Sequence, residues 1–136
     1  MSELHKRVYF TIIGLAIISM VSLMTFFMSI YLDIMLCEKL CEIAEMRIIG
    51  LVEYCSKRNI TIRISLNEIV NRPMELIVVN SNTLLIAIPT KYFHVKVTKC
   101  VKFDNINFNY TGMLPFSFYF IFLRINNTSF VMVREA

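Results

Sequence analysis

The segment from Val8 to Leu32 most constrains the fold of this chain, because it holds no charged residue and no proline. An apolar run of about 18 residues or more is typical of a transmembrane helix, since about 20 residues at 1.5 Å each cross the hydrocarbon core of a bilayer. Within lipid, a single segment satisfies its backbone N–H and C=O groups only as a helix. The sequence therefore predicts one membrane-spanning helix at residues 8–32, with the lipid bilayer as its first partner.

The charges on either side of this run predict its orientation. The short leader, residues 1–7, ends in Lys6 and Arg7, whereas Asp33, Glu38 and Glu42 follow the run. The positive-inside rule then places the N-terminus in the cytoplasm and the C-terminal region outside a cell membrane. A cleaved secretory signal is the alternative, but its apolar part is shorter, about 7–15 residues, and a small-residue cleavage site follows it. The pattern favours an uncleaved signal-anchor.

Small residues recur along one side of the expected membrane helix. Such residues let a second transmembrane helix approach closely, and their hydroxyls can bond across the contact. The alternative is that the hydroxyls bond to carbonyls of their own helix. We expect a helix-packing face for copies of this chain or related subunits. Its residues are Thr11, Gly14, Ser22, Thr25 and Ser29.

Residues 33–58 contain no proline and one glycine, Gly50, so the helix is expected to continue out of the membrane as an amphipathic stem. Glu38, Glu42 and Glu45 form a polar stripe. The sequence predicts that the opposite, apolar stripe packs against a domain and that the helix ends at Ser56, before Lys57, Arg58 and Asn59. The apolar stripe consists of Cys37, Cys41, Ala44, Ile48, either Leu51 or Val52, and Cys55.

From Asn59 onward the apolar period changes from that of a helix to that of a strand. Ile60, Ile62 and Ile64 alternate with polar residues, and turn-forming residues separate the later runs. Lys99 falls on the apolar side of its run, which predicts a bulge or a strand end near it. The expected strands cover residues 60–66, 76–79, 84–88, 93–103, 106–110, 116–125 and 129–134.

The closing hairpin has the strongest pattern. One side of its first strand carries phenylalanines from Phe116 to Phe122, and the other carries Tyr119, Ile121 and Leu123. Two apolar sides predict a central strand that is covered on both faces. The chain is thus expected to be an α+β protein. Its long helix would be followed by an antiparallel sheet or small sandwich at residues 59–136.

The four cysteines leave two interpretations open. Cys37, Cys41 and Cys55 share the apolar stripe, and Cys100 lies far along the chain. A bridge between Cys55 and Cys100 would tie the top of the stem to the sheet and close a long loop, which suits an oxidising exterior. The alternative is four buried free thiols.

Four asparagines fit the N-x-[ST] acceptor pattern and lie in expected turns or strand ends on the external side. They are candidate glycosylation sites in a eukaryotic, viral or archaeal host. The four are Asn59, Asn109, Asn126 and Asn127.

No chemistry-bearing motif is apparent in the sequence. With three glycines in all, the chain has no glycine-rich phosphate loop. His5 and His94 fall on opposite sides of the membrane, so neither a metal site nor a catalytic grouping is expected, and His94 is interpreted as a solvent-facing strand residue. Lys96 and its neighbouring lysines are interpreted as a solvated strand face, not a nucleic-acid site. We expect no enzyme, cofactor or small-molecule substrate.

The layout of the chain resembles that of type IV pilin-like proteins, including pseudopilins. A charged leader, an apolar helix, an amphipathic stem and a β domain follow one another. Archaeal pilin-like surface proteins offer a similar C-terminal run, here ELIVVNSNTLLIAIP after a proline-containing turn, then the hairpin FSFYFIFLRINNTSFVMV. The resemblance implies a subunit of a cell-surface filament or secretion-type assembly. The alternative is a single-pass accessory or receptor module, or a viral envelope component, whose β domain binds a surface partner.

Overall fold

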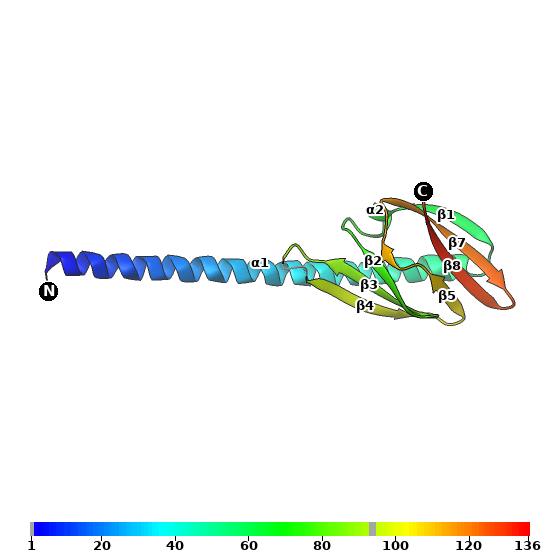
Figure 1. Ribbon diagram of the computed structural model, residues 1–136, viewed down its shortest axis with the longest axis horizontal. Helices are drawn as coiled ribbons and strands as arrows, with labels where there is room; N and C mark the ends of the chain where they lie inside the picture. The colour runs from blue at the N-terminus through cyan, green and yellow to red at the C-terminus, as the bar shows by residue number, and fades with distance from the viewer. Residues whose placement is uncertain (1, 93–94) are drawn as a thin grey trace. The chain divides into compact units, whose positions relative to one another are not determined.

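The chain has α+β architecture. The computed structural model describes residues 2–92 and 95–136, so Phe93 and His94, which were expected in a strand, lie outside the described residues. The described part contains a long helix, α1 (Glu3–Cys55), a single-turn helix, α2 (Leu66–Ile69), and eight strands (Figure 1). The chain divides into two compact units, Met1–Asp33 and Ile34–Ala136.

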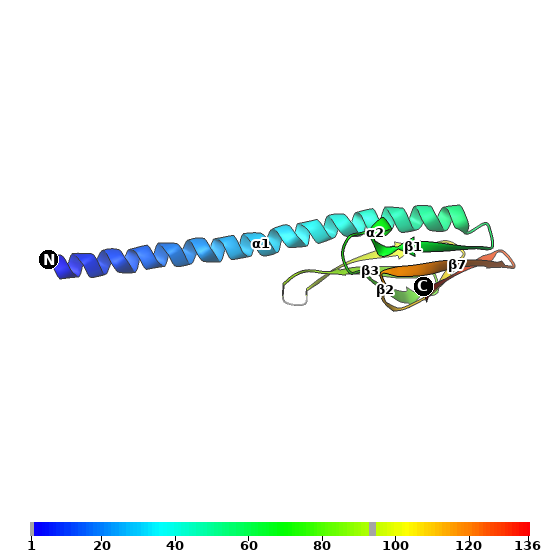
Figure 2. The same ribbon diagram turned by 90° about the horizontal axis from the view of Figure 1, so that it is seen from above.

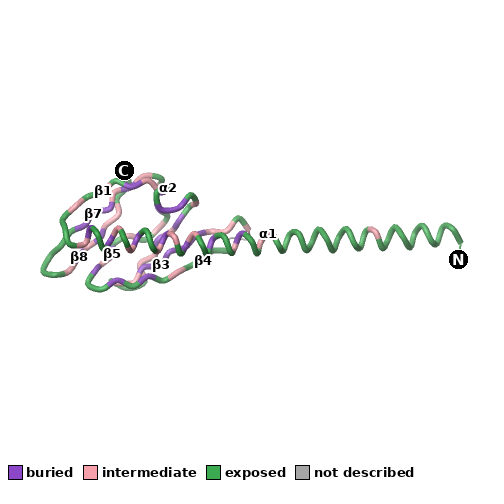
Figure 3. Tube along the Cα trace, turned by 180° about the vertical axis from the view of Figure 1, so that it is seen from behind, coloured by how far each residue is buried: buried purple, intermediate pink, exposed green. Residues whose placement is uncertain are grey.

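The first unit consists of the N-terminal part of α1. The helix begins at Glu3, before the apolar run, and the Ser2 hydroxyl accepts a hydrogen bond from the backbone N–H of His5 at 3.3 Å. This is the geometry of an N-cap. Among the described residues, α1 is the one helix long and apolar enough to cross a membrane. Its large apolar side chains in this unit are mostly exposed (Figure 3).

In the second unit, α1 carries the predicted amphipathic stem. Cys37, Cys41, Ala44, Ile48, Val52 and Cys55 are all buried, so the stripe is confirmed, and it includes Val52 instead of the half-buried Leu51. The helix ends at Cys55, one residue before the expected end. Its end is tied to the sheet by the Ser129 hydroxyl, which donates to the Ser56 carbonyl at 2.7 Å.

Eight strands form two sheets of four. Sheet A has the order β1-β7-β8-β5 and sheet B the order β4-β3-β2-β6. Sheet A consists of β1 (Ile60–Ser65), β7 (Ser117–Ile125), β8 (Thr128–Glu135) and β5 (Ile106–Asn109). Sheet B consists of β4 (Lys96–Lys102), β3 (Thr83–Pro89), β2 (Glu75–Asn80) and β6 (Gly112–Met113).

The expectation of a purely antiparallel sheet is wrong at one pair. β5 and β8 are parallel, with Ile106 opposite Ser129 and Phe108 opposite Val131. Parallel neighbours require a crossover connection, and the chain through β6 and β7 supplies it.

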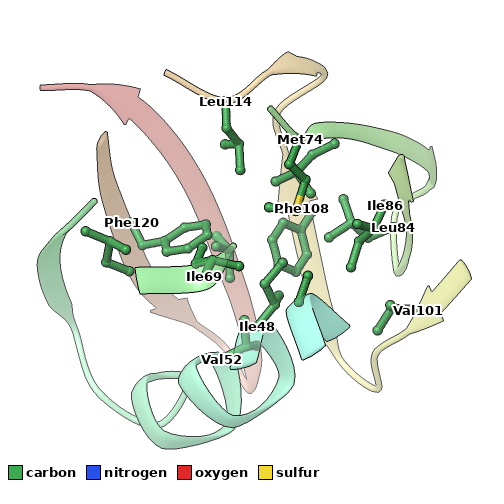
Figure 4. Close-up of a cluster of buried hydrophobic side chains, with 14 of the residues drawn as sticks. Ile48, Val52, Ile69, Met74, Leu84, Ile86, Val101, Phe108, Leu114 and Phe120 are labelled. Atoms are coloured by element: carbon green, nitrogen blue, oxygen red, sulfur yellow. The ribbon is translucent and has the colours of Figure 1, made fainter. Parts of the chain in front are cut away.

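One hydrophobic core lies between the stem and the two sheets. The stem part of α1 runs along one side of the sheets (Figure 2), and Ile48 and Val52 point into the same cluster as Phe108 and Phe120 (Figure 4). Phe118, Phe120 and Phe122 are each at most 1% exposed. The stem therefore covers the inner face of the phenylalanine strand, since the same core holds both.

Three further expectations are wrong. Among the described residues, nothing fully covers the second side of β7, because Leu123 and Ile125 are exposed. Phe116, which was expected in the strand, precedes it with 67% of its surface exposed. Neither a bulge nor a strand end occurs at Lys99: β4 continues to Lys102, and the β3–β4 register is continuous with Lys99 opposite Ile86. The lysine is accommodated because its Nζ lies 2.8 Å from the Glu45 carboxylate of α1.

Candidate functional site

The predicted packing face of the apolar helix uses part of its hydrogen-bonding capacity within the helix. The hydroxyls of Thr11, Thr25 and Ser29 donate to the carbonyls of Arg7, Val21 and Thr25 at 2.8–2.9 Å. The alternative of bonding within the helix therefore holds for these three residues. Their hydroxyl protons already take part in hydrogen bonds within the helix. A partner helix could still pack closely against these small side chains and donate hydrogen bonds to their oxygen atoms.

No described residue packs against Gly14 closely enough to require glycine there. A Cβ added at this position would meet no atom within 4 Å. Glycine in a helix interior costs about 0.8–1.0 kcal/mol relative to alanine. An open glycine on an exposed helix leaves room for close approach by a second helix.

The second candidate surface is the outer face of sheet A, defined as Tyr119, Ile121, Leu123 and Ile125 of β7 with Phe130 and Met132 of β8. These six residues are half-buried or exposed although all are large and apolar. Apolar patches on a folded surface are typical of binding sites.

Two arginines border one end of this outer face. Arg63 of β1 and Arg134 of β8 are both opposite Tyr119 in the strand registers, so the three side chains share one side of the sheet. Both arginines are exposed, and the Arg63 Nε donates to the Ser117 hydroxyl at 3.3 Å. The face thus combines an apolar centre with positive charge at one end.

The cysteines are free thiols, so the predicted bridge between Cys55 and Cys100 is wrong. Cys55 points into the core from α1, whereas Cys100 is exposed. Side chains alternate along β4, and the neighbouring Val101 points into the core, which turns Cys100 outward. The alternative interpretation, four buried free thiols, is confirmed for Cys37, Cys41 and Cys55 and is wrong for Cys100.

Two of the buried thiols, Cys41 and Cys55, sit in a setting that disfavours their ionisation. Burial raises the pKa of Cys41 to about 11, and the neighbouring Cys37 acts in the same direction. The Cys41 thiol lies 3.5 Å from the Val97 carbonyl, and Arg72 Nη1 donates to the Cys37 sulfur at 2.9 Å. Burial also raises the pKa of Cys55. Cys41 and Cys55 therefore have a structural role, since reactive cysteines have lowered pKa values.

All four candidate glycosylation residues are exposed. The Asn59 side-chain oxygen accepts a hydrogen bond from the Arg124 backbone N–H at 2.8 Å, which leaves the amide nitrogen available. Asn109 ends the edge strand β5, and Asn126 and Asn127 form the β7–β8 turn.

A groove of about 490 Å³ lies near the end of α1. Its lining includes two carboxylates, Glu53 and Asp104, and two lysines, Lys57 and Lys102, so the charges balance and favour no ligand of one sign. Within the described ranges, no group of three histidine, cysteine or acidic side chains could hold a metal ion.

Comparisons with protein-family models, with curated proteins and with solved structures find no match to this chain. Function is therefore inferred from the chain's own residues.

Proposed function

We propose that this protein is a membrane-anchored, pilin-like or pseudopilin-like subunit of a cell-surface filament or secretion-type assembly. Its role is structural and involves no catalysis. Lys6 and Arg7 keep the N-terminus in the cytoplasm, and the second unit lies outside the membrane.

The observation that supports this proposal is the difference in the exposure of apolar side chains between the two parts of the 53-residue helix α1. In the first unit its apolar side chains are exposed, whereas in the second unit its apolar stripe is buried beneath two sheets. Leaving these apolar side chains in water would cost a large hydrophobic free energy, so lipid or another apolar helix is expected to cover them. This layout is also what the resemblance to pilin-like proteins implies.

Self-association through the anchor follows from its small residues. Lipid tails are as apolar as leucine, so helices associate in membranes through close packing at small residues. Gly14, which no intrachain contact explains, lies on the side where Thr11 and Thr25 also lie.

The test compares two substitutions in the full-length protein, with copies cross-linked in native membranes. Gly14→Leu should lower the yield of cross-linked copies. Ala16→Leu is the matched control, because residue 16 lies about 200° around the helix from residue 14 and the added side chain is the same. Native-membrane sizing and the N-terminal mass, measured together, report assembly and leader removal. An intact, strictly monomeric protein would contradict the proposal.

A second candidate function is a single-pass accessory or receptor module, or a viral envelope component. The exposed outer face of sheet A favours it, because Leu123 and Ile125 are available to a surface partner. Cross-linking from this face would recover a different protein if this function is correct, and self-contacts alone would argue against it.

A further inference from the structure

We propose that the β3–β4 end of sheet B is a second membrane-binding site, which enters the phospholipid headgroup layer on the side where the stem leaves the bilayer. This lipid-contact site consists of Lys91, Tyr92 and Val95. The inference rests on the proposed function, since it requires α1 to be a membrane anchor. It adds a contact with lipid that the apolar helix itself does not make.

The stem and β4 run side by side in opposite directions. Lys99 Nζ lies 2.8 Å from the Glu45 carboxylate, and the Cys41 thiol lies 3.5 Å from the Val97 carbonyl. Two residues of a strand span about 6.6 Å and four residues of a helix about 6 Å, so these contacts follow one another along both elements. The start of β4 therefore lies toward the N-terminal end of the stem (Figure 1).

The connection between β3 and β4 continues in the same direction. Pro89 ends β3, and its carbonyl lies 3.9 Å from the Cys37 sulfur. The next backbone pair is closed by the Thr90 N–H, which donates to the Val95 carbonyl at 2.7 Å. The lipid-contact site therefore lies level with Cys37 or nearer the N-terminal end of the stem.

The residue count along α1 places this level at the membrane surface. The predicted span ends at Leu32, and Cys37 follows after five residues, about 7.5 Å of helix. The headgroup layer on each side of a bilayer is about 5–8 Å thick. The exposed side chains of the stem change at the same level, because Met35 and Leu36 are apolar and the carboxylate of Glu38 follows.

The side chains of the lipid-contact site suit this layer. Lys91 is exposed, Tyr92 is half-buried, and Val95 is 44% exposed although it is apolar. Tyrosine is enriched at membrane–water interfaces, and lysine can place its alkyl chain in apolar surroundings while its ammonium group reaches a phosphate. The Thr90 hydroxyl and the Val95 N–H both donate to the Tyr92 carbonyl, at 2.9 and 3.2 Å, which holds the site in shape.

The site gives the second unit its own contact with the bilayer. The sheets lie along one side of the stem (Figure 2), so a lipid contact at the β3–β4 end restricts tilting of the unit on that side. Copies anchored in one membrane would then present their sheets at the same height above the lipid. This arrangement favours lateral assembly of the subunits.

The test uses tryptophan as a reporter, because the chain contains none. Full-length variants are purified and reconstituted in phosphatidylcholine vesicles, with and without bromine on the acyl chains near the headgroup, where bromine quenches a nearby indole. Tyr92→Trp should lose fluorescence in the brominated vesicles and emit at shorter wavelength than Tyr54→Trp. Tyr54→Trp is the matched control, because Tyr54 is 67% exposed and lies about 25 Å along the helix from Cys37.

Two more reporters separate this inference from the proposed anchor. Phe27→Trp lies inside the predicted span and should be quenched, and Val95→Trp reports the lipid-contact site if Tyr92→Trp lowers the melting temperature. Quenching of Phe27→Trp without quenching at positions 92 and 95 would overturn the inference and leave the anchor standing. Equal quenching of Tyr92→Trp and Tyr54→Trp would also overturn it. No quenching at any position would contradict both proposals.

A buried charge gives a second test. Val95→Asp, added to Tyr92→Trp, should reduce the quenching, because a carboxylate is costly to move out of water. Val79→Asp is the matched control: Val79 is also exposed, at 54%, and lies toward the other end of sheet B. Both changes should leave the melting temperature in detergent nearly the same, since surface substitutions have small effects. Equal effects of the two substitutions on quenching would contradict the lipid-contact site.

Discussion

Phe118, Phe120 and Phe122 are three of the five buried phenylalanines among the described core residues of the second unit. Phe118 and Phe120 pack edge to face with ring centroids 5.2 Å apart, and Phe120 and Phe122 lie 6.0 Å apart. The alternation of the strand directs all three inward. Phe116 continues the same alternation in the sequence but precedes β7 and is exposed.

Phe120→Ala should therefore destabilise the protein strongly, by about 3–5 kcal/mol, because it leaves a cavity in the core. Denaturant unfolding of the full-length protein in detergent, followed by circular dichroism, measures the effect. Phe116→Ala is the matched control and should change the free energy of unfolding by about 0.5 kcal/mol or less. Similar losses for both substitutions would contradict the burial described for β7.

The thiol of Cys41 predicts a loss of stability in alkaline solution. Its pKa rises from 9.0 to about 11 on folding, so the unfolded chain releases this proton first. Stability should be complete below about pH 9 and fall as the pH rises toward 11, by at most about 1.4 kcal/mol per pH unit. The measurement is the difference in pH dependence between the wild type and Cys41→Ala.

Cys100→Ala serves as the control for this pH dependence, since Cys100 is exposed. If wild type and Cys41→Ala lost stability in parallel above pH 9, burial of the Cys41 thiol would not be the cause.

At the residue level, the outcome at Lys99 depended on a neighbour that the local sequence does not reveal. Lys99 was expected to interrupt its strand, but Glu45, far away in the sequence, pairs with it. The outcome at Cys100 did have a local signal: the alternation of β4 places Val101 on the inner side and Cys100 on the outer side, away from Cys55. The two-residue period of a strand thus predicts which residues share a side, but not which element covers that side.

At the scale of elements, periodicity predicted the stem stripe and the hairpins β2–β3 and β7–β8, because these depend on local spacing and turn residues. The parallel pairing of β5 with β8 joins residues about 20 apart through a crossover, and no local signal marks it. The exposed outer face of β7 was missed because an apolar strand surface looks the same whether its own chain or a partner covers it.

The β7–β8 turn gives a prediction at this scale. Asn126 and Asn127 have φ angles of 49° and 65°, the left-handed conformation that two-residue hairpin turns require. Asn127→Gly should stabilise the hairpin by a few tenths to about 1 kcal/mol, and Asn127→Val should destabilise it by about 1–2 kcal/mol. Melting temperatures of protein from a host that does not glycosylate test both; a gain from valine would contradict the turn geometry.

At the scale of the whole molecule, Cys100 is a natural reporter of orientation. It is the exposed cysteine, whereas Cys37, Cys41 and Cys55 are buried. If the second unit lies outside the membrane, a membrane-impermeant maleimide should label intact cells at one site per chain. The mass of the labelled protein gives the number of maleimide labels per chain.

Cys100→Ala should abolish this labelling while leaving the protein in the membrane fraction. Labelling that appears only after the cells are permeabilised would reverse the proposed orientation.

The position of β8 bears on the order in which the protein can mature. β8 follows the other seven described strands along the chain, yet it lies between β7 and β5 inside sheet A. The apolar helix is synthesised before the sheets, so it is available to a bilayer while sheet A still lacks an interior strand. Folding of the second unit must therefore wait until β8 has been synthesised and, under the proposed orientation, has crossed the membrane. A nascent chain stalled before Thr128 would expose the three core phenylalanines to chaperones and proteases.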